Sequence, residues 1–313
     1  MTTSSVDLLP GSTMACASSR ARRRRDGRRP AWVAAAIGPG LVVVSSLAVQ
    51  LGAASSKDVL VVIAPGAVTG VRFSIAAAVL MVLARSRLRG RSRAQWAAIV
   101  GFGIVLALSN WSFTEAIARI PLGTAVALEF CGPFAIAALG SRRLRELGSV
   151  ALAASGVVLI AQPAAAGSAS GVGFGLLAGA CWAGYTLLSA RVGRHTTGLD
   201  GLALAAVVAA LLAAPATATA LPKLDATVVV PLAVSAVLGV VAAFSLELET
   251  LRRTDTRTVA VLFSWEPAVA ALVGLIALDQ VLSAPALLGI GAVVLAGTMV
   301  TVHGASPPTP GGR

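Results

Sequence analysis

Long apolar stretches separated by short polar segments run along most of this chain. Residues 147–190 show the pattern most clearly, because they contain no charged residue. A membrane-spanning helix needs about 20 apolar residues, so this stretch is long enough for two helices and too long for one. The sequence PAAAGSASG at 163–171 divides it, since clusters of proline, glycine and serine favour turns.

The same pattern predicts ten membrane-spanning helices over the whole chain. They are expected at 32–54, 65–84, 95–117, 121–140, 146–162, 171–190, 200–220, 228–251, 257–278 and 284–303. Composition agrees, because 57% of the residues are hydrophobic and only 12% are charged, about half the charged fraction of an ordinary soluble protein. The predicted fold class is therefore an all-α membrane protein that forms one membrane domain.

The two ends of the chain differ from the rest. Residues 1–30 contain SSRARRRRDGRRP and few apolar residues, which predicts a disordered basic arm lying on the anionic inner leaflet of the membrane. Residues 304–313 are expected to form a disordered tail. The arginines followed by an apolar run and LGAASS can also be read as a signal peptide, but the first apolar run is long and also corresponds to a later one.

The distribution of arginine and lysine predicts the orientation of the helices. If the N-terminus is cytoplasmic, 21 of the 25 Lys and Arg residues fall in inside segments, three fall in outside loops and Arg72 lies in the membrane. Cytoplasmic loops of membrane proteins carry an excess of these residues. Both termini are therefore predicted to be cytoplasmic. The net charge of +12 reflects these loops, so we do not expect a nucleic-acid partner.

The chain contains a weak internal repeat. Shifting the sequence by 134 residues aligns Pro133 with Pro267, and it also aligns two E-x-x-x-R segments that begin at Glu115 and Glu249. The repeat unit holds five helices, so the second copy must enter the membrane with the opposite orientation. We therefore predict two inverted five-helix repeats, 31–162 and 171–303, which is an architecture of secondary transporters that use alternating access.

Two glutamates stand inside otherwise apolar helices. Glu129 in VALEFCGPF is the only charged residue of 120–141, and Glu266 in LFSWEPAVA is the only one of 258–278. Both lie near the middle of the bilayer, where an ionised carboxylate costs at least a few kcal/mol. Such groups face a water-filled cavity or a partner, so both are predicted to lie on the pathway of substrate or protons. The alternative is a structural carboxylate that bonds to a neighbouring helix or is kept neutral by burial.

Two prolines and an arginine accompany these glutamates. Pro133 and Pro267 each lack a backbone donor, which predicts broken helices that line the site. Arg72 must lie inside the second helix, because the uncharged run 73–84 is too short to cross a membrane. We expect Arg72 to be either the counter-ion of Glu129 or a clamp for a substrate carboxylate.

Other candidates for the pathway are uncharged. Trp182, Tyr185 and Trp265 are expected to line the cavity, and Asn110 is expected to make either a polar bond between helices or a substrate contact. Gly175, Gly179 and Ala183, spaced four residues apart, favour close helix packing.

Features of an enzyme or a metalloprotein are not recognised. The three cysteines form no C-x-x-C pair and the two histidines are isolated, so no disulfide framework, metal or cofactor is predicted. G-x-S-x-G, H-E-x-x-H and a phosphate-binding glycine loop are also missing from the sequence. We therefore do not expect an enzyme.

Several strings resemble a known family. PLGTAVALEFCGPFAIAALGSRR, GACWAGY, SLELETLRRTDTRT and WEPAVAAL are similar to ten-helix, EamA-type members of the drug/metabolite transporter superfamily. Within it the resemblance is strongest to the threonine and homoserine exporters of the bacterial inner membrane, and it covers about residues 32–303.

This resemblance implies proton-coupled export of small amino acids through a central cavity between two inverted helix bundles. It points to Arg72, Glu129, Glu247 and Glu266 as site residues. The chain departs from those exporters at Glu249, where they are apolar, so an interfacial salt bridge is the simpler role for that residue. A multidrug or other metabolite exporter of the same superfamily is the main alternative. A lipid flippase or an intramembrane enzyme is a more distant one.

Overall fold

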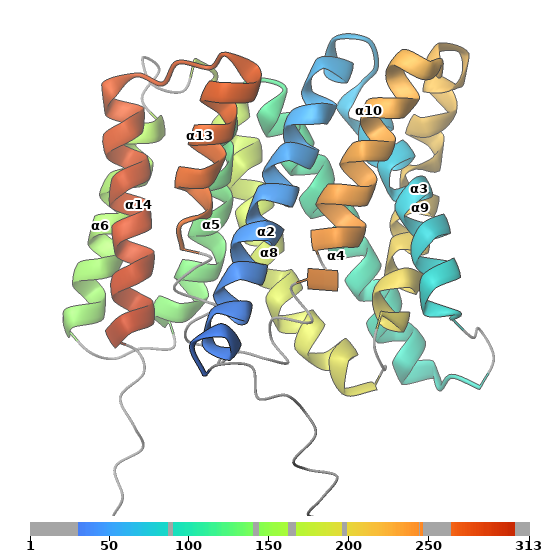
Figure 1. Cartoon of the computed structure of the whole chain (residues 1–313), viewed down its shortest axis with the longest axis horizontal. Coiled ribbons are helices and arrows are strands. Elements are labelled where there is room, and N and C mark those ends of the chain that lie inside the picture. Colours follow the sequence, from blue (N-terminus) through green and yellow to red (C-terminus); the bar gives the residue numbers. More distant parts are fainter. Residues whose placement is uncertain are drawn as a thin grey trace, which may run out of the picture.

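The computed structural model describes residues 31–86, 90–139, 144–161, 167–195, 199–243, 245–246 and 264–303. Within these ranges the regular structure is entirely helical and contains ten α-helices, as predicted (Figure 1). They are α2 Ala31–Lys57, α3 Pro65–Ala84, α4 Arg93–Ile117, α5 Leu122–Leu139, α6 Leu144–Ala161, α8 Ala169–His195, α9 Asp200–Ala220, α10 Ala226–Ala236, α13 Glu266–Leu278 and α14 Ala284–His303. Short 3₁₀ turns follow α2 (η1, Asp58–Val61) and α9 (η2, Leu221–Lys223), and a π-helix (η3, Val237–Ala242) follows α10.

The helices stand side by side in one bundle, with α6 and α14 at one edge and α3 and α9 at the other (Figure 1). Four segments are long and apolar enough to cross a membrane within the described residues, namely Gly40–Val61, Pro65–Ala84, Arg93–Ile117 and Asp200–Lys223. The start of α2 and the end of α14 lie at the same end of the bundle (Figure 1). The protein is therefore an all-helical, multi-pass membrane protein.

Local sequence explains where several helices begin. The α4 helix starts with a capping box, in which the Ser92 hydroxyl accepts from the Gln95 N–H and the Gln95 side chain accepts from the Ser92 N–H. The Asp225 side chain caps α10 in a similar way. Pro65 stands in the first turn of α3, where its missing N–H removes no helical bond. These features match the predicted boundaries to within a few residues.

The packing of the helices follows a symmetric scheme. In the first half of the chain α4 and α5 pack against α8, and in the second half α10 and α13 pack against α2. The α3–α9, α5–α13 and α6–α14 pairs each join corresponding helices of the two halves. This is the pairing that two inverted repeats produce. The repeat boundaries at 31–162 and 171–303 remain predictions.

The crossing of α5 and α8 requires glycine. A Cβ atom on Gly132 would lie 1.8 Å from the Gly179 carbonyl oxygen, and one on Gly179 would lie 2.8 Å from the Glu129 carbonyl oxygen. A Cβ atom on Gly175 would lie 2.9 Å from Leu128. The prediction of close helix packing along α8 is thus confirmed at Gly175 and Gly179.

The two predicted proline breaks have different outcomes. The break at Pro133 is wrong, because α5 continues through this position to Leu139. A membrane helix tolerates an internal proline when its surroundings satisfy the freed backbone groups. Pro267 does stand at a helix start, since α13 begins at Glu266. Residues 257–263 of that predicted span lie outside the described residues.

Large apolar side chains cover the outside of the bundle. Val82, Leu212, Ile276 and Leu288 are exposed, whereas the core is rich in small residues such as Ala67, which is fully buried. An outer apolar surface with small residues between helices is typical of packing in a membrane.

Candidate functional site

Glu266 is held by two side chains of another helix. It is the first residue of α13, and only 4% of its surface is exposed. The Ser46 hydroxyl donates to its Oε1 atom at 2.5 Å, and Gln50 Nε2 donates to its Oε2 atom at 2.6 Å. Ser46 and Gln50 are one turn apart on α2, so they share one helix face. We call Ser46, Gln50 and Glu266 the clasp, because together they join α2 to α13.

The clasp lies in the depth of the bundle. The α13 helix has only 13 residues and occupies the upper part of the bundle in Figure 1, so its first residue lies near mid-height. The position of Glu266 in the first turn also suits the helix dipole, which favours negative charge at a helix N-terminus. The structural alternative considered for this glutamate, a bond to a neighbouring helix, is therefore what the clasp provides.

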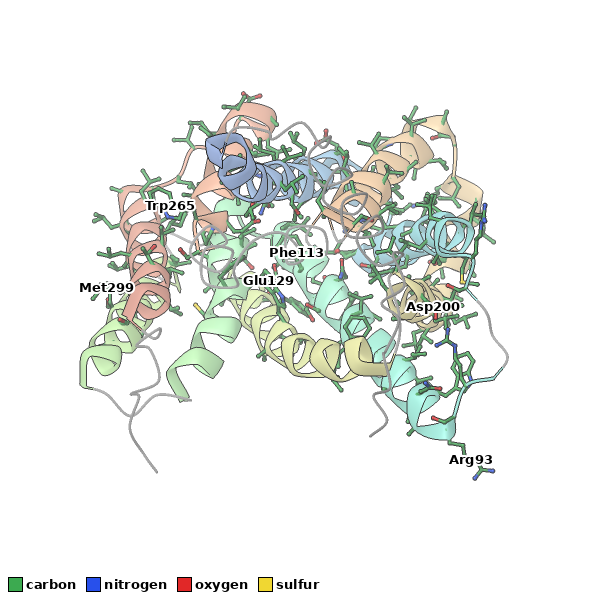
Figure 2. The ribbon with its side chains drawn as sticks, turned by 60° about the horizontal axis from the view of Figure 1, so that its bottom comes forward. Arg93, Phe113, Glu129, Asp200, Trp265 and Met299 are labelled. Carbon is green, nitrogen blue, oxygen red and sulfur yellow. The ribbon has the colours of Figure 1, made fainter. Side chains whose placement is uncertain are left out.

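Glu129 has a different environment. It lies within α5, and Figure 2 shows it in the interior of the bundle beside α8. Its side chain is partly buried, and within the described residues it makes no hydrogen bond or ion pair. Glu266 and Cys181 lie close enough to interact with it electrostatically. The structure therefore brings the two predicted glutamates close together. Both oxygens of Glu266 accept hydrogen bonds, whereas Glu129 makes none within the described residues.

An aromatic pair lies next to Glu129. Phe130, the following residue on α5, packs edge-to-face against Trp182 of α8, with ring centroids 4.6 Å apart and an interplanar angle of 82°. Trp182 was a predicted cavity residue, and it lies in this part of the bundle. Such edge-to-face pairs fix the relative positions of two rings, so the helix segment that carries Glu129 is well anchored.

Arg72 is buried, with 5% of its surface exposed. Its guanidinium lies beside the π-helix, because a Cβ atom on Gly239 would be 3.3 Å from Arg72 Nη2. Among the described residues Arg72 Nε has no hydrogen-bond partner, and the guanidinium forms no ion pair. The prediction that Arg72 is the counter-ion of Glu129 is wrong. Arg72 stands on α3 and Glu129 on α5, and these helices have different main neighbours, α9 for α3 and α8 for α5, although both also contact α4.

The π-helix η3 fits closely between α2 and α3. A Cβ atom on Gly52 of α2 would lie 2.8 Å from the Gly239 backbone nitrogen, so the two backbones nearly touch. The Ser45 hydroxyl donates to the Ala243 carbonyl at 3.2 Å, just after the π-helix. Short π-helical segments inside helices often occur at functional sites. Here the segment brings a glycine beside the buried guanidinium.

Within the part of the chain that the structure describes, Asn110 makes no polar bond to another helix, which was one of its two predicted roles. Its Nδ2 atom donates to the Leu106 carbonyl of its own helix at 3.2 Å. Thr69 of α3 and Thr114 of α4 make the interhelical bond instead, at 3.2 Å. Thr114 in turn donates to the Asn110 carbonyl at 2.7 Å. A substrate contact by Asn110 remains a prediction.

The other predicted residues are an exposed tryptophan and three residues whose side chains the structure does not describe. Trp265 precedes α13, is 54% exposed and lies at the side of the bundle near α14 (Figure 2). The side chain of Tyr185 and all of Glu247 and Glu249 lie outside the described residues. Glu115 of the first E-x-x-x-R segment forms an ion pair with Arg119.

Sequence reasoning missed the two clasp residues of α2. The signal was present, since Ser46 and Gln50 are polar, lie four residues apart and interrupt the apolar run VVVSSLAVQ. Polar residues at this spacing in a membrane helix indicate a bond to a neighbouring helix. Only the fold could show that the partner is Glu266.

Comparison with known proteins agrees with this fold. A sequence model of the EamA-like transporter family matches residues 169–302. The chain is also 32% identical over 283 residues to a curated bacterial protein, and the alignment covers 88% of this chain and 94% of that relative. The chain therefore belongs to the EamA-like transporter family, and it is a transporter rather than an enzyme.

The particular relatives share one name. The protein just compared is the threonine/homoserine exporter RhtA of Escherichia coli (strain K12). The exporter of the same name from Salmonella typhimurium (strain LT2) is 32% identical over 282 residues, with 88% of this chain and 94% of that protein covered. One solved crystal structure aligns with a TM-score of 0.56 and 17% identity over 86% of this chain and 96% of its own length. At that identity the likeness shows the fold alone.

Proposed function

We propose that this protein is a secondary active transporter of the bacterial plasma membrane that exports small zwitterionic amino acids such as threonine and homoserine. Proton antiport and alternating access between two inverted five-helix repeats are part of the proposal. The names of the relatives, both threonine/homoserine exporters, support the substrate class and the direction. The symmetric pairing of helices in the two halves supports alternating access.

One observation carries the proposal. Arg72 and Glu129 are opposite charges in the membrane-embedded part of the bundle, and neither forms an ion pair within the described residues. An unpaired charge at this depth is costly, and such charges mark substrate and ion pathways. A zwitterionic amino acid supplies an ammonium for Glu129 and a carboxylate for Arg72. Substrate bound between the two residues would compensate both charges.

Glu129 also provides a simple form of coupling. A carboxylate that binds the substrate ammonium in one step can bind a proton after the substrate leaves. Because the two cations compete for one group, substrate and proton would cross in opposite directions. The partly open position of Glu129 beside α8 suits this exchange, whereas both oxygens of Glu266 are already bonded.

The test uses purified protein in lipid vesicles loaded with radiolabelled threonine. We expect a pH gradient to drive threonine transport against its concentration gradient. Glu129→Gln should abolish this uphill transport but retain exchange down a gradient. Glu115→Gln is the matched control, because Glu115 pairs with Arg119 instead. Uphill transport by Glu129→Gln at the wild-type rate would refute the proton role.

Arg72→Lys tests the carboxylate clamp. A planar guanidinium can hold a carboxylate with two parallel bonds, and an ammonium cannot. We expect threonine affinity to fall about tenfold, which corresponds to roughly the strength of one such charged hydrogen bond. Unchanged affinity in a well-folded Arg72→Lys protein would contradict the clamp. Dye efflux or lipid scrambling by wild-type protein, in place of threonine flux, would identify a multidrug exporter or a flippase.

A further inference from the structure

Two helix crossings that correspond in the two halves of the chain differ in composition. One is made of glycines and the other of buried polar side chains. The shift of 134 residues that aligns the repeats places Gly132 of α5 on Glu266 of α13. At the α5–α8 crossing Gly132 and Gly179 bring two backbones into direct contact. At the α2–α13 crossing the contact is the clasp, made of three buried polar side chains. The glycine contact at the first crossing contains no titratable group, whereas the second contains the carboxyl group of Glu266.

The clasp occupies both carboxylate oxygens of Glu266. Each carboxylate oxygen accepts a hydrogen bond from α2, and the short distances show direct contact between the side chains. Glu129 has no such donors within the described residues. We infer that Ser46 and Gln50 are positioning residues that make Glu266 an interhelical clasp and leave Glu129 as the carboxylate that exchanges protons. This inference rests on the proposed function, since it divides two roles within the same site.

The clasp can persist in either protonation state of Glu266. The Gln50 Oε1 atom is buried and has no hydrogen-bond partner among the described residues. Rotation of the amide exchanges its oxygen and nitrogen, so Gln50 can donate to a carboxylate or accept from a protonated carboxyl. The Ser46 hydroxyl can also donate or accept. The α2–α13 bond is therefore insensitive to a proton on Glu266.

The groups that face Glu266 support this division. The α13 helix packs against α2, α5 and α14. The α2 helix presents Ser46 and Gln50, and α5 presents Glu129 as an interacting titratable group. The α14 helix has His303 at its far end and no Asp, Glu, Lys or Arg. Within the described residues Glu129 is thus the ionisable neighbour with which Glu266 shares the site.

The clasp also fixes a free helix end. Because α13 begins at Glu266, the clasp attaches its first turn to α2. That turn is otherwise closed by backbone bonds, in which the Ala268 and Val269 N–H groups donate to the Trp265 carbonyl at 2.9 and 3.1 Å. Its N-cap residue, Trp265, makes no side-chain capping bond. Loss of Ser46 or Gln50 should therefore loosen α13 and leave Glu266 as a buried carboxyl with unmet bonds.

The first experiment needs no substrate. Gln50→Leu removes the amide at similar size, and Ser46→Ala removes the hydroxyl. Each should lower the apparent melting temperature of the purified protein by about 5 °C, as expected for a lost bond to a charged group. Ser56→Ala is the matched control, because among the described residues the buried Ser56 hydroxyl bonds to the Ala53 carbonyl of its own helix and to no other helix. Gln50→Leu should cost little in a Glu266→Leu background, where its partner is already absent.

The second experiment separates the glutamates by transport. We expect Glu266→Gln to keep pH-driven uphill threonine flux within about twofold of wild type, since the amide can bond to both Ser46 and Gln50. Glu129→Gln should lose that flux. Gln50→Leu should shift the pH profile of flux, because it exposes Glu266 as a second titrating group, and adding Glu266→Gln should restore the wild-type profile.

The outcomes are distinct. Loss of uphill flux in Glu266→Gln, with retention in Glu129→Gln, would overturn the inference. So would melting temperatures of the Ser46 and Gln50 variants equal to that of Ser56→Ala. If wild-type protein carries no threonine, the proposed function fails, but the melting experiments still decide whether the clasp exists.

Discussion

Adding one methyl group at Gly132 tests the backbone contact beneath Glu129. In Gly132→Ala the new Cβ atom would lie 1.8 Å from the Gly179 carbonyl oxygen, 2.4 Å from its carbon and 3.0 Å from its Cα. Carbon atoms ordinarily approach to about 3.5–4.0 Å, so α5 and α8 must separate by more than an ångström. All three obstructing atoms belong to the backbone, which cannot rotate away as a side chain can.

The expected loss of stability follows from this geometry. Overpacking a core costs about 1–3 kcal/mol even where side chains can adjust, so we expect about 3 kcal/mol or more for Gly132→Ala. At about 2–4 °C per kcal/mol for a chain of this size class, the melting temperature should fall by roughly 6–12 °C. Gly173→Ala on α8 is the control, because nothing lies within 4 Å of its new Cβ. Replacing a helical glycine with alanine in open space is neutral or stabilising by up to about 1 kcal/mol.

The assay is thermal unfolding of both variants in the same detergent, followed by threonine affinity of the folded proteins. Because Glu129 lies one turn before Gly132 on α5, separation of the helices should also weaken threonine binding. Equal melting temperatures for Gly132→Ala and Gly173→Ala would refute the close crossing, and with it the placement of Glu129 against α8.

Two further predictions concern the ends of helices. Reporter fusions after residues 90 and 195 should report the cytoplasm and a fusion after residue 58 the outside, and an external signal at residue 90 would overturn the predicted orientation. The hydrogen bond donated by the Thr227 hydroxyl, followed by the Val228 N–H, lowers the pKa of Asp225 below its ordinary value of 3.8. Its stabilising effect is therefore present above that value and lost as pH falls through the lowered pKa, so Asp225→Ala should reduce the melting temperature at pH 7 but progressively less below about pH 4. Asp225→Asn, which keeps a capping oxygen, is the control, and a pH-independent effect of Asp225→Ala would contradict this account.

The positions of the helices could be predicted well from sequence. The bounds of α3, α9 and α14 agree with the predicted spans 65–84, 200–220 and 284–303. In a membrane protein the apolar length and the flanking charges define each helix, and both can be read directly from the residues. The π-helix that interrupts the predicted span 228–251 was not predicted, and its close approach to Gly52 and Arg72 at Gly239 involves residues far away in the sequence.

The site could be predicted only in part. Membrane-embedded charge identified Arg72, Glu129 and Glu266, since each is conspicuous in an apolar segment. Their partners could not be inferred, because hydrophobic pattern fixes which face of a helix is polar but not which helix it meets. Arg72 was expected either to pair with Glu129 or to bind a substrate carboxylate, and the structure shows no ion pair between the two residues, whose helices have different main neighbours.

The clasp has a consequence for the synthesis of the protein. Its two donors on α2 precede Glu266 in the chain by 220 and 216 residues. At about 5–20 residues per second, the first helix is made roughly 10–40 s before the glutamate that satisfies Ser46 and Gln50. Throughout that time these polar groups must bond to water, lipid headgroups or other parts of the protein, since leaving them unpaired in hydrocarbon is unfavourable. An incomplete chain therefore carries a polar face on its first helix that still lacks its final partner, and the arrival of α13 supplies that partner.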